Sequence, residues 1–331
     1  MQLLRKIAFP ISLVYALVVS IRNGLYDIGF FKSTTFKTPT ICVGNLSVGG
    51  TGKTPMIEYL VGHLKAYYKV AVLSRGYKRK SKGFQIASKD GAVEELGDEP
   101  YQIFNKFPDI TVAVDADRRN GISNLEASVG PDVILLDDAF QHRKVKPDFS
   151  ILLTAYDNLY AKDWYLPTGN LRDTKKEARR AQVIVVTKCP DTLGEERQRM
   201  IRKSLKPKKG QQVLFSRLHY DDALKGNTPA LTLNGLLGQK ITLVTGIANP
   251  EPLVRYLKDK GVDLEHLEFR DHHFFSASEI ELFNSKPMVL TTEKDFARLK
   301  GKVAHLYYIQ VRHDFLNGGG ETLHNAIQGI M

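Results

Sequence analysis

The segment from Ser47 to Thr54, with the sequence Ser-Val-Gly-Gly-Thr-Gly-Lys-Thr, constrains the fold more than any other part of the chain. It follows the apolar run Thr40 to Val43 and precedes a helical pattern that starts at Pro55. A strand, a glycine-rich turn, a Lys-Thr pair and a helix in this order are typical of a phosphate-binding loop, or P-loop. The sequence therefore predicts that this segment binds a nucleotide.

Each residue type in the loop has a chemical reason to be there. Glycines let the backbone turn its N–H groups inward to form a concave anion site, and the following helix adds its positive dipole end. Lys53 can neutralise the β- and γ-phosphates, and the Thr54 hydroxyl can bind Mg²⁺. The residues predicted to bind the cofactor are Ser47, Val48, Gly49, Gly50, Thr51, Gly52, Lys53 and Thr54.

This segment has two alternative interpretations. The loop departs from the usual pattern because Ser47 stands where a glycine is common, so an ordinary glycine-rich turn is the alternative. A dinucleotide-binding turn fits less well, since Pro55 occupies the position of its third glycine. Guanine specificity has little support, because Thr187 and the late Asp191 break the guanine-reading Asn-Lys-x-Asp pattern.

A second signal is the apolar run 133–136, which is followed by Asp137 and Asp138. A hydrophobic strand that ends in acidic residues is the pattern in which a carboxylate holds Mg²⁺ beside a P-loop. The alternative is a strand followed by a polar turn. Gln141 and His142 follow closely, and we expect them at the same carboxyl edge of the sheet, where ligands of open α/β sheets bind.

Three more loops carry candidate residues. Arg75 follows the predicted strand 70–73 and is a candidate for binding an anion, although most basic clusters are only solvated surface. Asp98 precedes a helical pattern, so it is either a helix N-cap or a functional carboxylate. Arg172 and Asp173 lie in a loop that is either functional or an ordinary surface turn.

Strands alternate with helical segments from about Thr40 to Thr187, which predicts a doubly wound, mainly parallel sheet of the α/β class. A smaller α/β unit follows. The extended segments 212–219 and 305–311 are predicted to form a two-stranded hinge between the two units. The expected division is an N-terminal helix region at 1–35, a kinase core at 36–215, a smaller domain at 216–310 and a returning segment at 311–331.

The N-terminus and the charge both favour an anionic surface as a partner. Residues 7–20 are apolar but too short to span a bilayer, and cationic residues flank them, which predicts a helix lying in the membrane interface. A helix buried in the protein core is the alternative. Lys and Arg outnumber Asp and Glu by 47 to 36. The basic segments lack aromatic interleaving or a nucleic-acid-binding module, so nucleic acid is not expected as a partner.

Several blocks together resemble the tetraacyldisaccharide 4′-kinases of lipid A biosynthesis. They run in family order along almost the whole chain, which makes the set far more specific than any one block. Asp173 stands where the family often has Glu. The matching blocks are Val43–Asn45, Val48–Pro55, Leu73–Tyr77, Gly97–Pro100, Asp137–His142, Leu166–Arg172, Asp271–His272 and Thr292–Asp295.

The resemblance implies ATP-dependent phosphorylation of the 4′-hydroxyl of a tetraacylated glucosamine disaccharide 1-phosphate. It also implies a peripheral enzyme, expected as a monomer, on the cytoplasmic face of the bacterial inner membrane. By resemblance, Asp98 is the general base, oriented by His272 from the second domain. The other roles implied are phosphate binding by Lys53, Mg²⁺ binding by Thr54, Asp137 and Asp138, and charge stabilisation or substrate contact by Arg118, Arg172 and His142. Further candidates for substrate contact are Arg75, Gln141 and Asp173.

Two rival classes of function remain at this stage. One is a membrane-associated P-loop nucleotide switch that hydrolyses slowly, which the incomplete guanine-reading pattern weakens. The other is a membrane-binding module with a degenerate P-loop, against which the intact Lys53 and Thr54 argue. A measurement of nucleotide preference distinguishes the nucleotide switch from a kinase. A membrane-binding module with a degenerate P-loop would not bind Mg-ATP.

Overall fold

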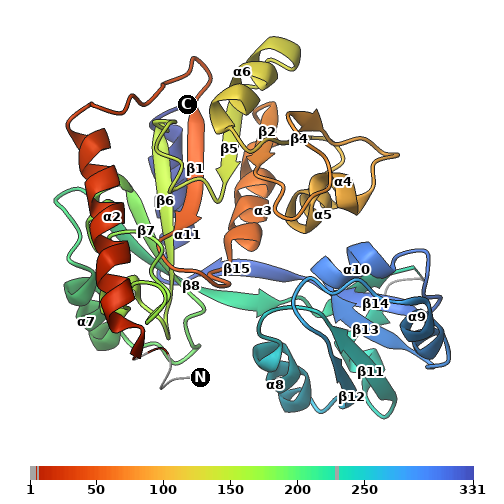
Figure 1. The fold of residues 1–331 in the computed structure, drawn as a ribbon. Coiled ribbons are helices and arrows are strands. Elements are labelled where there is room, and N and C mark those ends of the chain that lie inside the picture. The colour runs from red at the N-terminus through yellow and green to blue at the C-terminus, as the bar shows by residue number, and fades with distance from the viewer. Residues whose placement is uncertain (1–4, 6, 228–230) are drawn as a thin grey trace.

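The computed structural model describes residue 5 and residues 7–227 and 231–331. The chain forms a larger and a smaller lobe, each built on its own β-sheet, and a long pair of strands leads from one lobe to the other (Figure 1). The predicted α/β class with a large, mainly parallel sheet is confirmed.

The larger sheet has nine strands in the order β15-β8-β7-β6-β1-β5-β2-β4-β3. The strands from β8 to β4 pair in parallel, and the two edge strands pair antiparallel. The strands are β1 (Thr40–Asn45), β2 (Val70–Ser74), β3 (Gln85–Ile86), β4 (Thr111–Val114), β5 (Val133–Asp137), β6 (Phe149–Ala155), β7 (Val183–Thr187), β8 (Gln212–Tyr220) and β15 (Val311–Phe315).

Helices cover both faces of this sheet, because its central strands are apolar on both sides. Strand β1 is buried along its whole length, with Cys42 in one hydrophobic cluster and Ile41 and Val43 in the other. The helices of the first cluster are α6 (Arg118–Ser128) and α7 (Glu195–Leu205), and those of the second are α3 (Lys53–Leu64), α5 (Asp98–Lys106) and α11 (Gly319–Gln328). Short helices lie at α4 (Val93–Leu96), η1 (Tyr160–Lys162) and η2 (Lys175–Arg180).

The smaller lobe contains a six-stranded sheet in the order β10-β9-β14-β13-β11-β12. Its core is apolar and centres on buried residues such as Leu243 and Leu290. The strands are β9 (Ala223–Gly226), β10 (Leu231–Thr232), β11 (Lys240–Thr245), β12 (Asp263–Glu268), β13 (Val289–Thr292) and β14 (Leu306–Ile309). The helices are η3 (Leu233–Leu236), α8 (Glu251–Asp259), α9 (Ala277–Asn284) and α10 (Glu293–Leu299).

The hinge strands differ from the prediction. Strand β8 pairs antiparallel with β15, from Val311 opposite Tyr220 to Phe315 opposite Ser216. The segment expected to pair with β8 ends too early: most of it is β14, which belongs to the smaller sheet beside β13. Strands β14 and β15 are separated by a single residue, so the apolar pattern of the sequence does not show where one ends and the other begins. We propose on this strand order that residues 36–215 and 311–331 form the core domain and 216–310 the smaller one.

Helix α2 (Phe9–Asp27) packs on the larger lobe through polar contacts and leaves its apolar side chains in solvent. Ser12 Oγ donates to Thr168 Oγ1 at 2.7 Å, and the Tyr15 hydroxyl donates to the Arg172 carbonyl at 3.0 Å. The side chains that are 54% to 62% exposed are Ile11, Leu13, Val14, Leu17, Val18 and Ile21. The alternative of a helix buried in the protein core does not fit, because only 11% of the most apolar stretch of α2 is buried.

Candidate active site

The P-loop follows β1 and leads into α3, as its sequence predicts. Gly49 and Gly52 adopt φ angles of 111° and 84°, a region that L side chains rarely enter, so glycine is required at both positions. Val48 N–H donates to the Asn170 carbonyl at 2.8 Å, and the Gly52 carbonyl contacts His313 Nε2 at 2.9 Å. The loop is therefore held in place from two sides.

The carboxylates at the end of β5 lie in two different environments. Asp137 is buried: its Oδ2 accepts from Ser74 Oγ at 3.0 Å, while its Oδ1 has no hydrogen-bond partner within the described residues. Burial and the charge of Asp138 raise the pKa of Asp137 to about 6. A buried carboxylate oxygen with no partner beside a P-loop suits a cation, because an unpaired buried acceptor is otherwise costly.

Asp138 forms ion pairs with two cationic side chains of the site, Lys53 and Arg172. Arg172 Nη1 donates to its Oδ2 at 3.2 Å and Nη2 donates to its Oδ1, while Lys53 Nζ lies 3.8 Å away. Burial raises the pKa of Asp138, but Lys53 and Arg172 outweigh this and lower it. Arg172 reaches Asp138 from the loop that also contacts α2 and the P-loop. The structure thus brings together Lys53, Asp137, Asp138 and Arg172.

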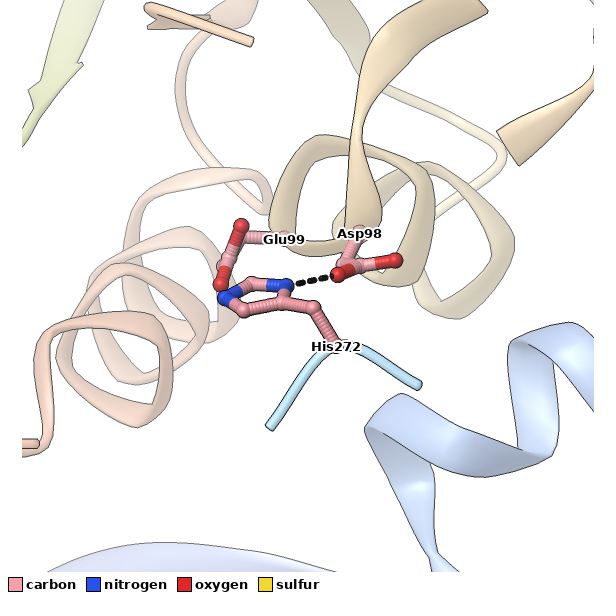
Figure 2. Close-up of side chains that lie close together, drawn as sticks. All are labelled: Asp98, Glu99 and His272. Atoms are coloured by element: carbon pink, nitrogen blue, oxygen red, sulfur yellow. Dashed lines mark hydrogen bonds and ion pairs between the residues drawn. The ribbon is translucent and has the colours of Figure 1, made fainter. Parts of the chain in front are cut away.

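A second cluster lies where the two lobes meet. Asp98, the first residue of α5, accepts a hydrogen bond from His272 Nδ1, although the two residues are 174 positions apart in the sequence. Figure 2 shows the imidazole of His272 between the carboxylates of Asp98 and Glu99. Asp98 makes no capping bond to α5, whose N-cap position is Gly97. The prediction of contact between Asp98 and His272 is thus realised in the structure, and the N-cap alternative does not hold.

Arg298 of α10 completes this cluster with a two-pronged contact to Asp98. Its Nε donates to Asp98 Oδ1 at 2.9 Å, and its Nη2 donates to Oδ2. Burial would raise the pKa of Asp98, but the hydrogen bonds from His272 and Arg298 and the charges of Arg298 and Lys294 lower it to about 2. Asp98 is therefore held as an anion at neutral pH.

The outer side of His272 faces further charged groups. Lys294 Nζ lies 3.3 Å from His272 Nε2, 3.1 Å from Asp271 Oδ1 and 3.5 Å from Glu99 Oε1. One donor atom from each of Asp98, Glu99 and His272 lies within 4.8 Å of the others, a spacing that could hold a metal ion. Arg298 and Lys294 already pair with these carboxylates, so we interpret the cluster as an ion-paired Asp-His group.

Two predicted substrate residues are buried instead of open. Arg118 is 2% exposed and donates to the backbone carbonyls of Asp115 at 2.6 Å and Asp137 at 3.0 Å, so it supports the strand ends. Asp173 is fully buried, and its Oδ1 accepts from Asn23 of α2 at 2.6 Å. These positions argue against direct substrate contact for either residue, and sequence could not reveal this because the burying elements are distant in the chain.

The remaining candidates lie near the surface. Gln141 donates to the Asn45 carbonyl, and Arg22 of α2 donates to the Gln141 carbonyl at 2.9 Å. Burial and the nearby charge of Arg118 lower the pKa of His142 to about 4, so His142 is neutral at pH 7. Arg75 is exposed at a cavity of about 420 Å³ whose lining includes Tyr77, Lys78, Arg79 and Lys82.

Sequence reasoning missed Arg298 and His313 as parts of the site. Arg298 lies one helical turn beyond Lys294 in α10, which is the only local signal that it faces the same cluster. His313 lies on β15, and its Nδ1 contacts Ser216 Oγ at 2.9 Å while its Nε2 reaches the P-loop. No motif marks either residue.

Comparison with known proteins agrees with this geometry. A family model described as tetraacyldisaccharide-1-P 4′-kinase matches residues 4–329. The chain belongs to this family. A tetraacyldisaccharide 4′-kinase of Flavobacterium johnsoniae is 51% identical over 96% of this chain and 94% of its own length. One from Bacteroides thetaiotaomicron is 43% identical over 89% of this chain and 83% of its own.

The fold agrees with a solved member of the tetraacyldisaccharide 4′-kinase family. A crystal structure of LpxK from Aquifex aeolicus in complex with ATP superposes with a TM-score of 0.84 at 33% identity, covering 99% of both chains. The resemblance noted from the sequence motifs is thereby confirmed, and the chain is a kinase. The degenerate membrane-binding module is excluded by the same findings.

Proposed function

We propose that this chain transfers the γ-phosphoryl group of ATP to the 4′-hydroxyl of a tetraacylated glucosamine disaccharide 1-phosphate. Membership of the family supports the reaction, and the P-loop beside Asp137 and Asp138 supports ATP as the donor. The single observation that carries the proposal is the contact of Asp98 with His272 across the lobes. Phosphoryl transfer requires positioned charges more than covalent chemistry, and these residues supply them.

The P-loop and the acidic end of β5 would bind different parts of Mg-ATP. The P-loop amides and Lys53 hold the phosphates, and Mg²⁺ would be held by Thr54, Asp137 and Asp138. The fit rests on the orphaned buried Oδ1 of Asp137. When bound, Mg²⁺ neutralises charge on the β- and γ-phosphates. Arg172 and Lys53 add two positive charges beside Asp138, where they neutralise the transferring group.

The pair Asp98–His272 receives the proton of the attacking hydroxyl. His272 sits at a φ of 62°, in the left-handed region that costs energy for a residue with a Cβ, and its side chain contacts Asp98 from there. Arg75, Gln141 and His142 stay as proposals for substrate contact, since they lie at the same carboxyl edge of the larger sheet.

Helix α2 supports peripheral attachment to a membrane. Its apolar side chains face solvent while its polar side chains bind the larger lobe. A helix that packs in a protein core has the opposite arrangement, with its apolar side chains buried. By length and composition it could also cross a bilayer, but its polar contacts with the lobe favour a helix that lies in the interface. The proposed substrate is acylated and lies in a membrane, and ATP is available on the cytoplasmic side. The protein therefore acts at the cytoplasmic face of the inner membrane in this proposal, and we expect it to be a monomer.

Transfer of radiolabel from γ-labelled ATP to the tetraacylated disaccharide 1-phosphate in detergent micelles tests the proposal. We expect labelled lipid from wild type and a loss of at least about a hundredfold for Asp98→Ala, as for removal of a proton-transfer group. Asp90→Ala, at an exposed loop position, is the matched control and keeps full activity. Wild type that binds ATP or GTP but labels no lipid would support the nucleotide switch instead.

A further inference from the structure

Trp164, the only tryptophan of the chain, lies at the surface beside Phe9, the first residue of α2. The two rings meet edge-on, with 5.4 Å between their centroids and an interplanar angle of 73°. Trp164 is 56% exposed and Phe9 is 37% exposed. The aromatic pair gains contact energy from this geometry, yet most of the indole stays in water. The protein therefore keeps a large apolar side chain at its surface, next to the exposed face of α2.

The backbone of Trp164 is held by a tightly hydrogen-bonded loop. Asp163 Oδ1 accepts from the Trp164 N–H at 2.8 Å and from the Asn170 N–H at 3.2 Å. The Trp164 carbonyl accepts from the Leu171 N–H at 2.9 Å. A Cβ on Gly169 would lie 2.2 Å from the same carbonyl oxygen, so only glycine allows this close approach. The indole is therefore exposed on a loop whose own backbone is well packed.

The same loop contacts the beginning of the P-loop. Ser47 Oγ donates to Asp163 Oδ2 at 3.4 Å. The Val48 N–H donates to the Asn170 carbonyl at 2.8 Å. Because Asp163 and Asn170 also belong to the hydrogen bonds that hold Trp164, a single loop joins the exposed indole to the nucleotide-binding loop.

The chemistry around Trp164 fits an anionic lipid surface. Lys162 is exposed two residues before Trp164, and the exposed Lys175 places its Nζ 2.9 Å from the Ala161 carbonyl, beside the same segment. Tryptophan is enriched where apolar chains meet water, because its ring is apolar and its N–H is polar, and nearby cations attract anionic headgroups. The acceptor in the proposed reaction is acylated, so the enzyme meets it at a lipid surface.

We propose that Trp164 enters the headgroup region of an anionic bilayer and forms a second membrane contact beside α2. The inference rests on the proposed peripheral attachment and adds to it a contact made by the loop that carries Arg172. This loop then meets lipid on one side and the P-loop on the other, so docking on the bilayer sets the height of the nucleotide site above the headgroups. An acceptor anchored in the same bilayer is presented to the site at that height.

Intrinsic fluorescence tests this contact, because all tryptophan emission of the chain comes from Trp164. Wild type without nucleotide is mixed with vesicles of phosphatidylglycerol and phosphatidylcholine, whose acyl chains are either unlabelled or brominated. With unlabelled vesicles we expect a blue-shifted emission and weaker quenching by acrylamide dissolved in the water, since the indole leaves water for the interface. With brominated vesicles we expect quenching by the lipid. Co-sedimentation of the same samples measures how much protein is bound.

Substitutions measure what the contact contributes to membrane binding. Trp164→Ser removes the ring, so we expect vesicle binding to weaken by about tenfold, because that ring would no longer leave water. Its melting temperature and its Mg-ATP binding should stay close to those of wild type. Trp164→Phe keeps an apolar ring and should retain most of the binding. Tyr67→Ser, at an aromatic side chain that is 77% exposed just after α3, is the matched control and keeps full binding.

Three results would overturn the inference while leaving the kinase reaction intact. One is wild type that co-sediments with the vesicles while Trp164 keeps its emission and its quenching by acrylamide. Another is equal vesicle binding by wild type and Trp164→Ser. The third is a blue shift that grows with protein concentration in the absence of lipid, which would identify a second copy of this chain as the occupant. Wild type that binds no vesicles contradicts peripheral attachment as well, whereas absence of lipid phosphorylation in micelles contradicts the proposed function.

Discussion

At the scale of single residues, His313 shows how burial at the nucleotide site sets a charge state. The ring is buried between Ser216 Oγ and the Gly52 carbonyl, and its burial lowers its pKa to about 4. A Cβ on Gly52 would lie 3.1 Å from the ring, so both residues are fitted to this contact. His313 is therefore neutral while the P-loop is intact.

This contact predicts a loss of stability in acid. The unfolded chain binds a proton at His313 near pH 6.5, but the folded chain does so only near pH 4, so folding stability falls as pH drops between these values. The full effect is about 3 kcal/mol. Urea unfolding at pH 7 and pH 4.5 should show a smaller loss for His313→Gln than for wild type. His142 titrates in both proteins, so an equal loss in both would contradict the prediction.

At the scale of elements, α2 joins an exposed apolar face to the active-site loop. Its polar side contacts Thr168, Arg172 and Asp173, and its apolar side is exposed. An exposed apolar face of this size is typical of a membrane or protein contact. The same helix therefore supports the loop that carries Arg172.

We expect the variant Ile11→Glu, Val14→Glu, Val18→Glu to lose binding to vesicles of anionic phospholipid by at least about a hundredfold, because three apolar side chains would no longer leave water. Its melting temperature should stay close to that of wild type, since all three side chains face solvent. Vesicle co-sedimentation measures the binding. Met200→Glu, on the exposed face of α7, is the control, and equal binding by both variants would exclude α2 as the anchor.

At the scale of the whole molecule, a buried ion network joins the lobes beside the hinge. Lys106 of α5 contacts Glu58 of α3 at 2.6 Å and Glu293 of α10 at 3.0 Å, and Gln310 donates to Glu293 at 3.0 Å. With the contact of Asp98 to Arg298, this network holds the lobes together in the arrangement of Figure 1. We infer that closing the lobes assembles the proton-accepting pair, a role known for domain closure in enzymes.

Removing one interlobe contact should therefore loosen the closed state. Glu293→Ala leaves Lys106 paired with Glu58 inside the larger lobe, so we expect a larger radius of gyration in solution scattering and a higher KM for the lipid. Lys65→Met, which breaks a surface pair with Asp109 within one lobe, is the control. Scattering profiles of wild type that are identical with and without Mg-ATP and lipid would contradict closure during the cycle.

Local patterns predicted much of the fold and the part of the site that is local in sequence. The P-loop and the acidic end of β5 each occupy one strand end, so short-range motifs determine them. The contact of Arg298 with Asp98 joins residues 200 positions apart and depends on how the lobes meet. The burial of Asp173 depends in the same way on where α2 packs.

The return of β15 to the larger sheet sets the order in which the protein can be completed during synthesis. His313 contacts Gly52 across 261 positions, and Leu323 and Ile327 of α11 join the same hydrophobic cluster as Met56 and Leu60 of α3. The smaller lobe is complete once β14 has left the ribosome, before the nucleotide-binding lobe has its last strand and helix. A nascent chain that ends before α11 therefore lacks part of the packing behind its P-loop, and we expect it to bind ATP more weakly than a chain that includes α11.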